Sequence, residues 1–277
     1  MRSMKLNLVI LCALLATLFA ACGGSSQSAS TSNGNGPITI KVGASPSPHA
    51  EILRYIKDKL AAKAGLDLQI VEFTDYVQPN LALKDGQINA NFFQHVPYME
   101  DFNKQHGMNM VSVAKVHIEP LGVYSHKVKT LKDVPNGAVV AIPNDATNGG
   151  RALHLLADNG VLTLKDGVGT DATIHDIAAN PKNLQIKELE AAQLPRSLDD
   201  TTLSVINGNY AITTGLNPDK DALALEKGQG NPYANVLAVI KGHENDPGVT
   251  KLAKLLTSPE VKKFIEDKYK GSVIPAF

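Results

Sequence analysis

ITIKVG, residues 38–43, reads as a short strand that ends in glycine, and it sets the pattern for most of the chain. Apolar and polar residues alternate from Ile38 to Val42, which is the period of a half-buried strand. Gly43 then leaves room for a ligand or another backbone segment to come close. The segment that follows, residues 48–64, places apolar residues at helical spacing and predicts a helix.

The same alternation of strand and helix continues along the chain and then restarts. Further strands are expected over residues 68–73, 88–93, 110–115, 138–143, 184–189, 203–206 and 236–240, and further helices over residues 80–86, 96–107, 150–159, 194–200 and 249–269. Strands that alternate with helices predict α/β architecture with mainly parallel sheets covered on both faces. We therefore expect two lobes joined by two crossing strands around a hinged cleft. Lobe 1 would span residues 38–123, completed by 237–277, and lobe 2 residues 124–236.

The N-terminus has the layout of an export signal. Basic residues precede an apolar run over residues 8–20, which is shorter than the ~20 residues that a membrane-spanning helix needs. Small residues then precede Cys22, and the sequence LFAAC resembles a bacterial lipobox, with Phe19 where leucine is usual. We interpret residues 1–21 as a lipoprotein signal peptide and Cys22 as the lipidated residue; an ordinary signal followed by a stray cysteine is the alternative.

The segment after Cys22 supports an anchor. Residues 22–37 are rich in Gly, Ser and Asn and carry no large apolar side chain after the cysteine, so they should form a flexible linker. Loss of Arg2 and Lys5 with the signal leaves 27 − 2 = 25 basic against 27 acidic residues, a net charge near −2. This balance argues against nucleic-acid partners. Because the other cysteine, Cys12, lies in the signal, no internal disulfide is expected.

Motifs for catalysis are absent from the sequence. It has no GxSxG, HExxH, P-loop or GxGxxG between a strand and a helix. His49-Ala50-Glu51 and His117-Ile118-Glu119 resemble half of a deaminase signature, but the cysteine half is missing. The eight histidines are scattered. We expect no enzyme activity, no cofactor and no metal; whether Glu119 and Asp145 assist in the cleft stays open.

Eight segments, in the same order along the chain, are similar to the methionine-binding lipoproteins of ABC importers, the NlpA/MetQ family. They are VGASPSPHAE (Val42–Glu51), EFTDYVQPN (Glu72–Asn80), NANFFQHVPY (Asn89–Tyr98), HIEP (His117–Pro120), AIPNDATNGGRAL (Ala141–Leu153), ELEAAQLPRSLDD (Glu188–Asp200), VINGNY (Val205–Tyr210) and NPYAN (Asn231–Asn235). The similarity extends over residues 38–277.

This resemblance implies a two-lobed periplasmic-binding-protein fold of type II-like architecture, with a free amino acid, usually methionine, in the cleft. It implies a monomer that is anchored outside the cytoplasm by lipid on Cys22, on the periplasmic side if the host has two membranes. Its partners would be L-methionine and an ABC permease with its ATPase. The ligand-binding positions that carry over are Tyr76, Phe93, His95, Tyr98, Arg151, Asn207 and Asn235.

The polar members of this set suit a zwitterion. The guanidinium of Arg151, near a predicted helix start, can take a carboxylate in two parallel hydrogen bonds; a surface arginine lying over its helix is the alternative. Asn207 and Asn235 end strand-like runs and offer both donors and acceptors, although turn asparagines are common in such sequences. We interpret Asn209 as a turn residue of that kind.

The aromatic members would form a slot for the thioether tail. Sulfur near an aromatic edge gains ~0.3–1.5 kcal/mol, and burial of the chain adds ~1.5–3 kcal/mol. Tyr76, Phe93 and Tyr98 would line this slot, with His95 between them reaching the polar head of the ligand; an ordinary aromatic core and a core histidine are the alternatives. The spacing from Tyr76 selects Phe93 over its neighbour Phe92.

Two classes of function remain at this point. The first is a receptor that captures methionine and delivers it to an importer, with D-methionine or a methionyl dipeptide as other possible cargo. The second is a surface lipoprotein that acts mainly in adhesion or host contact.

Overall fold

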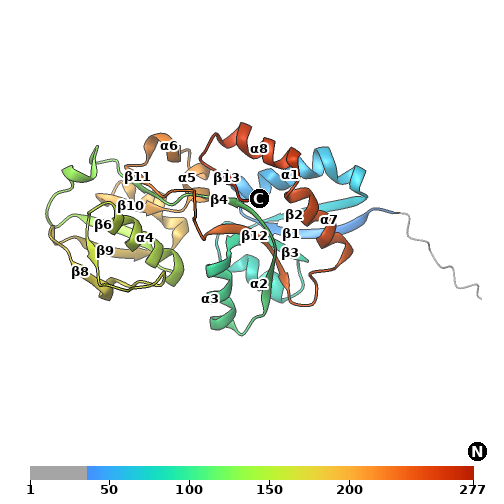
Figure 1. Ribbon diagram of the computed structural model, residues 1–277, viewed down its shortest axis with the longest axis horizontal. Coiled ribbons are helices and arrows are strands. Elements are labelled where there is room, and N and C mark those ends of the chain that lie inside the picture. The colour runs from blue at the N-terminus through green and yellow to red at the C-terminus, as the bar shows by residue number, and fades with distance from the viewer. Residues whose placement is uncertain (1–35) are drawn as a thin grey trace, which may run out of the picture. The chain divides into compact units, whose positions relative to one another are not determined.

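The structure is a computed structural model that describes residues 36–277. The predicted signal peptide, Cys22 and nearly all of the linker therefore lie outside the described residues. Gly36–Phe277 forms one unit and contains two main sheets (Figure 1). Among its helices, none is long and apolar enough to cross a membrane.

The first sheet has six strands in the order β13-β4-β12-β3-β1-β2. Its members are β1 (Ile38–Ala44), β2 (Leu66–Glu72), β3 (Ala90–His95), β4 (Met110–Ile118), β12 (Ala234–Ile240) and β13 (Ile274–Pro275). The chain returns to this sheet near its end, where β12 inserts between β3 and β4.

The second sheet has five strands in the order β11-β5-β10-β6-β9. They are β5 (Gly122–Tyr124), β6 (Val139–Pro143), β9 (Gln185–Leu189), β10 (Leu203–Ile206) and β11 (Ala224–Leu225). A separate two-stranded ribbon pairs β7 (Thr163–Leu164) with β8 (Ile177–Ala179). The chain crosses between the main sheets twice, at residues 119–121 and 226–233.

The expectation of mainly parallel sheets is wrong. Strand β1 runs parallel to β2 and β3, and β6 runs parallel to β9 and β10. However, β12 is antiparallel to both of its neighbours, and β5 is antiparallel to β10 and β11. The reversal follows from the two crossings, because a strand that enters a sheet from the other sheet runs against the strands that began there.

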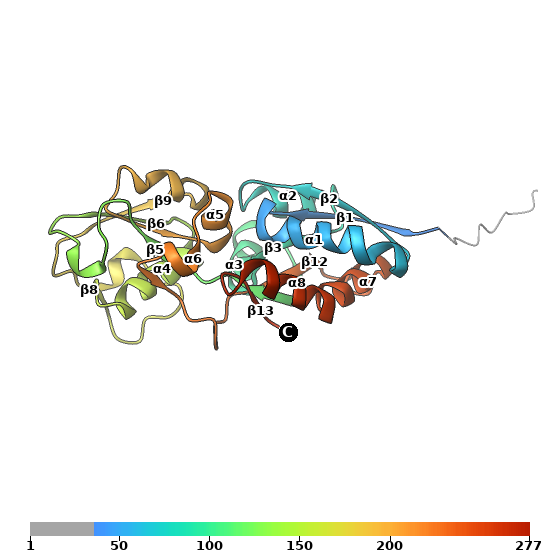
Figure 2. The same cartoon turned by 90° about the horizontal axis from the view of Figure 1, so that it is seen from above.

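Helices cover both faces of each sheet, as Figure 2 shows for the first. The helical elements are η1 (Pro46–Ala50), α1 (Glu51–Ile56), η2 (Lys57–Ala61), η3 (Ala62–Ala64), α2 (Gln78–Lys84), α3 (Val96–His106), η4 (Leu131–Asp133), α4 (Ala146–Asp158), η5 (Ile174–Asp176), η6 (Ala191–Leu198), α5 (Gly208–Thr213), α6 (Pro218–Asp221), α7 (Pro247–Leu256) and α8 (Pro259–Tyr269). Helices α1, α7 and α8 pack on one face of the first sheet, and α2 and α3 pack on the other. In the second sheet, α4 lies on one face, and η6 with α5 on the other.

The long helix predicted over residues 249–269 is two helices. Thr257 ends α7, and Ser258 then caps α8 by accepting a hydrogen bond from the Val261 N–H at 3.3 Å. Pro259 stands at the first helical position, where its missing N–H is not needed. The apolar period continues across this break, which is why periodicity alone merges the two helices.

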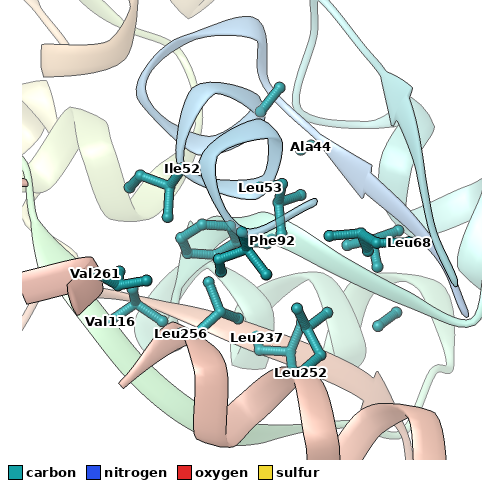
Figure 3. Packing of buried hydrophobic residues seen from close by; sticks show 14 of the residues in the cluster. Ala44, Ile52, Leu53, Leu68, Phe92, Val116, Leu237, Leu252, Leu256 and Val261 are labelled. Atoms are coloured by element: carbon teal, nitrogen blue, oxygen red, sulfur yellow. The ribbon is translucent and has the colours of Figure 1, made fainter. Parts of the chain in front are cut away.

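Figure 3 shows the largest core, which fastens the first sheet to α1, α7 and α8. Phe92 of β3, Leu53 of α1 and Leu252 of α7 are fully buried there. Each such side chain contributes ~1.5–3 kcal/mol by leaving water. This core holds β3 in place, and the carboxyl end of β3, from Phe93 to His95, lines the cavity described next.

Candidate ligand-binding site

All seven residues that the sequence selects line one cavity. Five further residues complete the wall, so that its full lining is Tyr76, Phe93, Gln94, His95, Tyr98, Glu119, Asn148, Arg151, Asn207, Gly208, Asn209 and Asn235. The lining comes from strands of the first sheet, from α4 and the residues after β10 beside the second sheet, and from the first crossing between them. All of these side chains except Tyr76 are buried.

His95 ends β3 and caps α3, and its hydrogen bonds fix its tautomer. Its Nδ1 accepts from the Tyr98 N–H at 3.2 Å, so its Nε2 carries the proton and donates to Asn148 Oδ1 at 3.1 Å. Burial, followed by the nearby charge of Arg151, lowers the pKa of His95 to about 3. The imidazole is therefore a neutral donor that links the first sheet to α4.

Asn148 organises the polar end of the cavity. Its amide nitrogen donates to both carboxylate oxygens of Asp145, at 3.0 and 3.1 Å, which turns its Oδ1 toward His95 and Asn207. Asn207 donates from Nδ2 to that oxygen at 2.9 Å. The Oδ1 of Asn207 is buried and has no hydrogen-bond partner among residues 36–277. Because a buried acceptor without a partner costs ~1–3 kcal/mol, this atom marks a place for a ligand donor.

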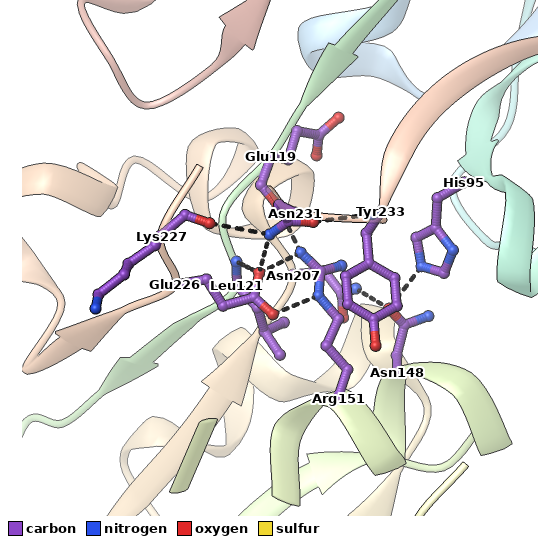
Figure 4. A network of polar contacts seen from close by, with 10 residues as sticks. All are labelled: His95, Glu119, Leu121, Asn148, Arg151, Asn207, Glu226, Lys227, Asn231 and Tyr233. Atoms are coloured by element: carbon purple, nitrogen blue, oxygen red, sulfur yellow. Dashed lines mark hydrogen bonds and ion pairs between the residues drawn. The ribbon is translucent and has the colours of Figure 1, made fainter. Parts of the chain in front are cut away.

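Arg151 connects the two crossings between the sheets (Figure 4). Its Nη2 donates to the backbone oxygen of Glu119 at 2.9 Å, and its Nε and Nη2 donate to the carboxylate of Glu226 at 2.7 and 2.5 Å. The guanidinium also lies 4.3 Å from the ring centroid of Tyr233. The sequence predicts two parallel hydrogen bonds from Arg151 to a ligand carboxylate. Glu226 takes such a pair from Nε and Nη2, and within residues 36–277 Nη1 donates no hydrogen bond, so Nη1 is the nitrogen that we assign to a ligand.

Aromatic rings form another part of the cavity wall. The ring centroid of Tyr76 lies 5.9 Å from that of Phe93 and 5.7 Å from that of Tyr98. Tyr98 Oη donates to the backbone oxygen of Tyr76 at 3.0 Å, which holds the two rings together. Phe93 lines the cavity, whereas Phe92 lies in the core on the other face of the strand, as the alternation of side chains along a strand requires.

Sequence reasoning missed Asn148 and misread Asn209. Asn209 is not a turn residue, because it lies inside α5, is 3% exposed and accepts a hydrogen bond from Tyr76 Oη at 2.5 Å. The dipeptide Asn-Gly at residues 207–208 suggested a turn, but it begins a helix. Asn148 stands in the pattern Asp145-x-x-Asn148, in which Asp145 caps α4, and that spacing was the available signal.

Close packing of α4 positions Arg151, and we expect Gly150→Ala to lower the melting temperature sharply. A Cβ at Gly150 would lie 2.8 Å from the Ala172 nitrogen and closer still to the Thr170 oxygen, both of them backbone atoms. Overpacking of this kind costs ~1–3 kcal/mol. Gly169→Ala is the control, since a Cβ there meets only the end of the Asp171 side chain at 3.0 Å. Equal melting temperatures for the two variants would contradict this account.

Two α/β lobes, two crossings and a cavity lined from both sheets define a two-lobed solute-binding protein of the periplasmic-binding-protein type. The profile of the NlpA lipoprotein family matches residues 40–277. The chain belongs to the NlpA lipoprotein family.

Similar proteins support this assignment along the whole chain. The methionine-binding lipoprotein MetQ of Bacillus subtilis (strain 168) is 41% identical over 277 residues, with 98% of each chain covered. The D-methionine-binding lipoprotein MetQ of Escherichia coli (strain K12) is 41% identical over 240 residues, 86% of this chain and 88% of the relative. The solved structure of a nutrient binding protein from Burkholderia cenocepacia bound to methionine has a TM-score of 0.83 and 49% identity, covering 86% of this chain and 100% of that one.

Proposed function

We propose that this protein is an extracytoplasmic, lipid-anchored receptor that captures methionine and delivers it to an ABC importer. The observation that carries the proposal is the cavity itself. It brings together the buried Arg151, a wall of aromatic rings and the acceptor Asn207 Oδ1, which has no partner in the described part of the chain. A cation, an acceptor and an apolar slot are what a zwitterion with a thioether tail requires. Relatives named for methionine binding support the same ligand.

In this proposal each part of methionine meets a different part of the wall. The carboxylate would accept from Arg151 Nη1 in a charge-assisted hydrogen bond. The ammonium would donate to Asn207 Oδ1 and to the carboxylate of Glu119, which lines the same cavity. The tail would lie against Tyr76, Phe93 and Tyr98, and the amide of Asn235 would close the remaining side.

Calorimetric titration of ligand-stripped protein tests the ligand. L-Methionine at 100 times its Kd should raise the free energy of unfolding by ~2.7 kcal/mol, which a thermal shift would register. Parallel titrations with D-methionine and a methionyl dipeptide, with mass spectrometry of solute retained through purification, identify the cargo. Absence of both heat and thermal shift with all three solutes would remove the proposal.

The lipid anchor and the transporter form a second part of the proposal. Lipidation of Cys22 would keep the receptor beside a permease and its ATPase, and lipoprotein relatives support this location. Cys22→Ala should release the protein from membranes while leaving methionine binding in solution intact. Cell fractionation checks the release from membranes, and calorimetry on the released protein checks that methionine binding is intact.

A further inference from the structure

Three buried titratable side chains meet behind the cavity wall, and one of them, His49, is 68 residues (117 − 49) from the nearer of the other two in the sequence. His49 of η1 and His117 of β4 both face Oε1 of Glu119, on the first crossing between the sheets. The His117 Nε2–Oε1 distance is 2.7 Å and the His49 Nε2–Oε1 distance is 3.2 Å. The exposed fractions are 1%, 0% and 6% for His49, His117 and Glu119. Only Glu119 lines the cavity itself.

The hydrogen bonds fix the protons on both imidazoles. His49 Nε2 faces two acceptors, Glu119 Oε1 and Asn235 Oδ1 at 3.1 Å, so it must carry a proton. His117 Nε2 faces the single acceptor Glu119 Oε1, and it carries a proton when Glu119 is ionised. Both Nδ1 atoms are buried, without a partner among the described residues, and are lone pairs. One carboxylate oxygen thus accepts from two ring N–H groups.

A metal ion on these three side chains is less consistent with the geometry. A metal would take the Nε2 lone pairs and shift both protons to Nδ1. Metal-bound histidines donate that second N–H to a carbonyl or carboxylate. Within residues 36–277 neither Nδ1 has a hydrogen-bond partner, so neither imidazole has the outer acceptor that a metal-bound histidine normally has. The arrangement instead suits an ionised carboxylate held by two neutral donors.

We propose that His49 and His117 are positioning residues that hold the Glu119 carboxylate at the cavity wall as the acceptor for the ligand ammonium. The inference rests on the proposed function, since it assumes an amino-acid ligand. A carboxylate has about four acceptor positions, so two bonds on Oε1 leave capacity on Oε2. The packing around Glu119 fixes it further: a Cβ on Gly208 would lie 2.8 Å from the Glu119 Cβ. The Glu119 carboxylate can therefore keep a fixed orientation at the cavity wall.

The charges around Glu119 make this arrangement sensitive to pH. Burial raises the pKa of Glu119, and attraction to His49 and Arg151, together with a hydrogen bond from the Asn209 backbone N–H, opposes the rise. Burial lowers the pKa of His49 to about 4 and that of His117 to about 3, so both are neutral at physiological pH. The titratable or charged groups that face Glu119 are His49, His117, Arg151, Tyr76 and Tyr269. Of these, the two histidines supply hydrogen bonds to the carboxylate itself.

The two histidines stabilise the ionised form of Glu119, and this determines how their removal shifts the pH dependence of ligand binding. Their N–H groups favour the carboxylate, so removal of one donor raises the pKa of Glu119 further. Ligand binding needs the carboxylate, so affinity is present above that pKa and is lost as pH falls through it. Removing a donor should therefore move the loss of affinity to higher pH.

The experiment is a calorimetric titration with L-methionine from pH 5 to pH 8 on the full chain and its His117→Leu and His117→Gln variants. Leucine removes the donor, whereas the glutamine amide can place an N–H near the former Nε2. We expect His117→Leu to weaken binding about 10-fold at pH 7. The pH at which affinity is lost on acidification should also be higher in this variant. His117→Gln should recover most of the affinity, and its affinity should fall at the same pH as in the unsubstituted chain. His49→Leu and His49→Gln form a second pair.

A measurement without ligand separates this inference from the proposed function. Carbon-13 NMR titration of Glu119 in the free protein should give a higher midpoint pH in His117→Leu than in the unsubstituted chain. In His117→Gln the midpoint should return to the value of the unsubstituted chain. His126→Leu is the control, because His126 pairs with Asp199 on the surface and should change neither profile. Identical Glu119 titration midpoints in all variants overturn the positioning role. Retention of one zinc ion, with loss of methionine binding when that ion is chelated, also overturns it. Failure of the unsubstituted chain to bind methionine, with shifted midpoints, overturns the ammonium role and the proposed function instead.

Discussion

Arg151→Ala is expected to weaken L-methionine binding by about 10- to 150-fold, the factor that corresponds to one charged hydrogen bond of ~1.5–3 kcal/mol. The variant removes the buried cation that would meet the ligand carboxylate. It also leaves the Glu226 carboxylate, which is 13% exposed, without its partner. Breaking a buried ion pair costs ~3–5 kcal/mol of stability, so the melting temperature should fall as well.

Two further variants separate binding from folding. Arg151→Ala combined with Glu226→Gln removes the unpaired charge, so stability should recover while affinity stays low. Arg54→Ala is the matched control, because Arg54 pairs with Glu72 on the surface, where both side chains are more than 40% exposed. Exposed pairs contribute ~0–1 kcal/mol, and methionine affinity should not change. Unchanged affinity in Arg151→Ala would return this arginine to a structural role.

Phe93→Ala should produce the second large effect, on stability and on ligand preference together. Truncation of a buried phenylalanine costs ~3–5 kcal/mol, and Phe93 is 3% exposed. It also removes one ring of the proposed tail slot, so methionine should lose more affinity than alanine, by a factor of roughly 2–13 if a sulfur–ring contact of ~0.3–1.5 kcal/mol is lost. Competition titrations of the two amino acids give the ratio.

Phe92→Ala provides the comparison for this result. Phe92 is adjacent and fully buried, but it packs in the core, with its ring centroid 4.8 Å from that of His49. We expect a similar loss of stability without a change in the methionine-to-alanine ratio. Equal losses for both amino acids in Phe93→Ala would argue against a slot for the thioether.

Local patterns predicted the elements well and their assembly less well. The strand at Ile38–Ala44 follows from alternation, but the antiparallel insertion of β12 depends on a pairing across more than a hundred residues, which no local window contains. At Ser258–Pro259 the sequence contains a helix cap and a proline, which indicate the start of a new helix. The apolar period continues through these residues, so periodicity alone predicts one helix.

The site divides in the same way. Arg151 and Phe93 stand in motifs that resemblance identifies, and both line the cavity. The pairing of Arg151 with Glu226 and the meeting of His49 with His117 join residues 75 and 68 positions apart (226 − 151 and 117 − 49), which only the fold brings together. Whether the seven selected residues bind methionine stays a prediction.

The contacts of Arg151 have a mechanical consequence. The guanidinium holds the backbone of one crossing at Glu119 and the side chain of the other at Glu226. If the lobes turn about these crossings, the residue that would grip the solute also restrains both pivots. Occupancy would then change the stiffness of the whole molecule, so a membrane partner could distinguish a loaded receptor from an unloaded one without touching its cargo.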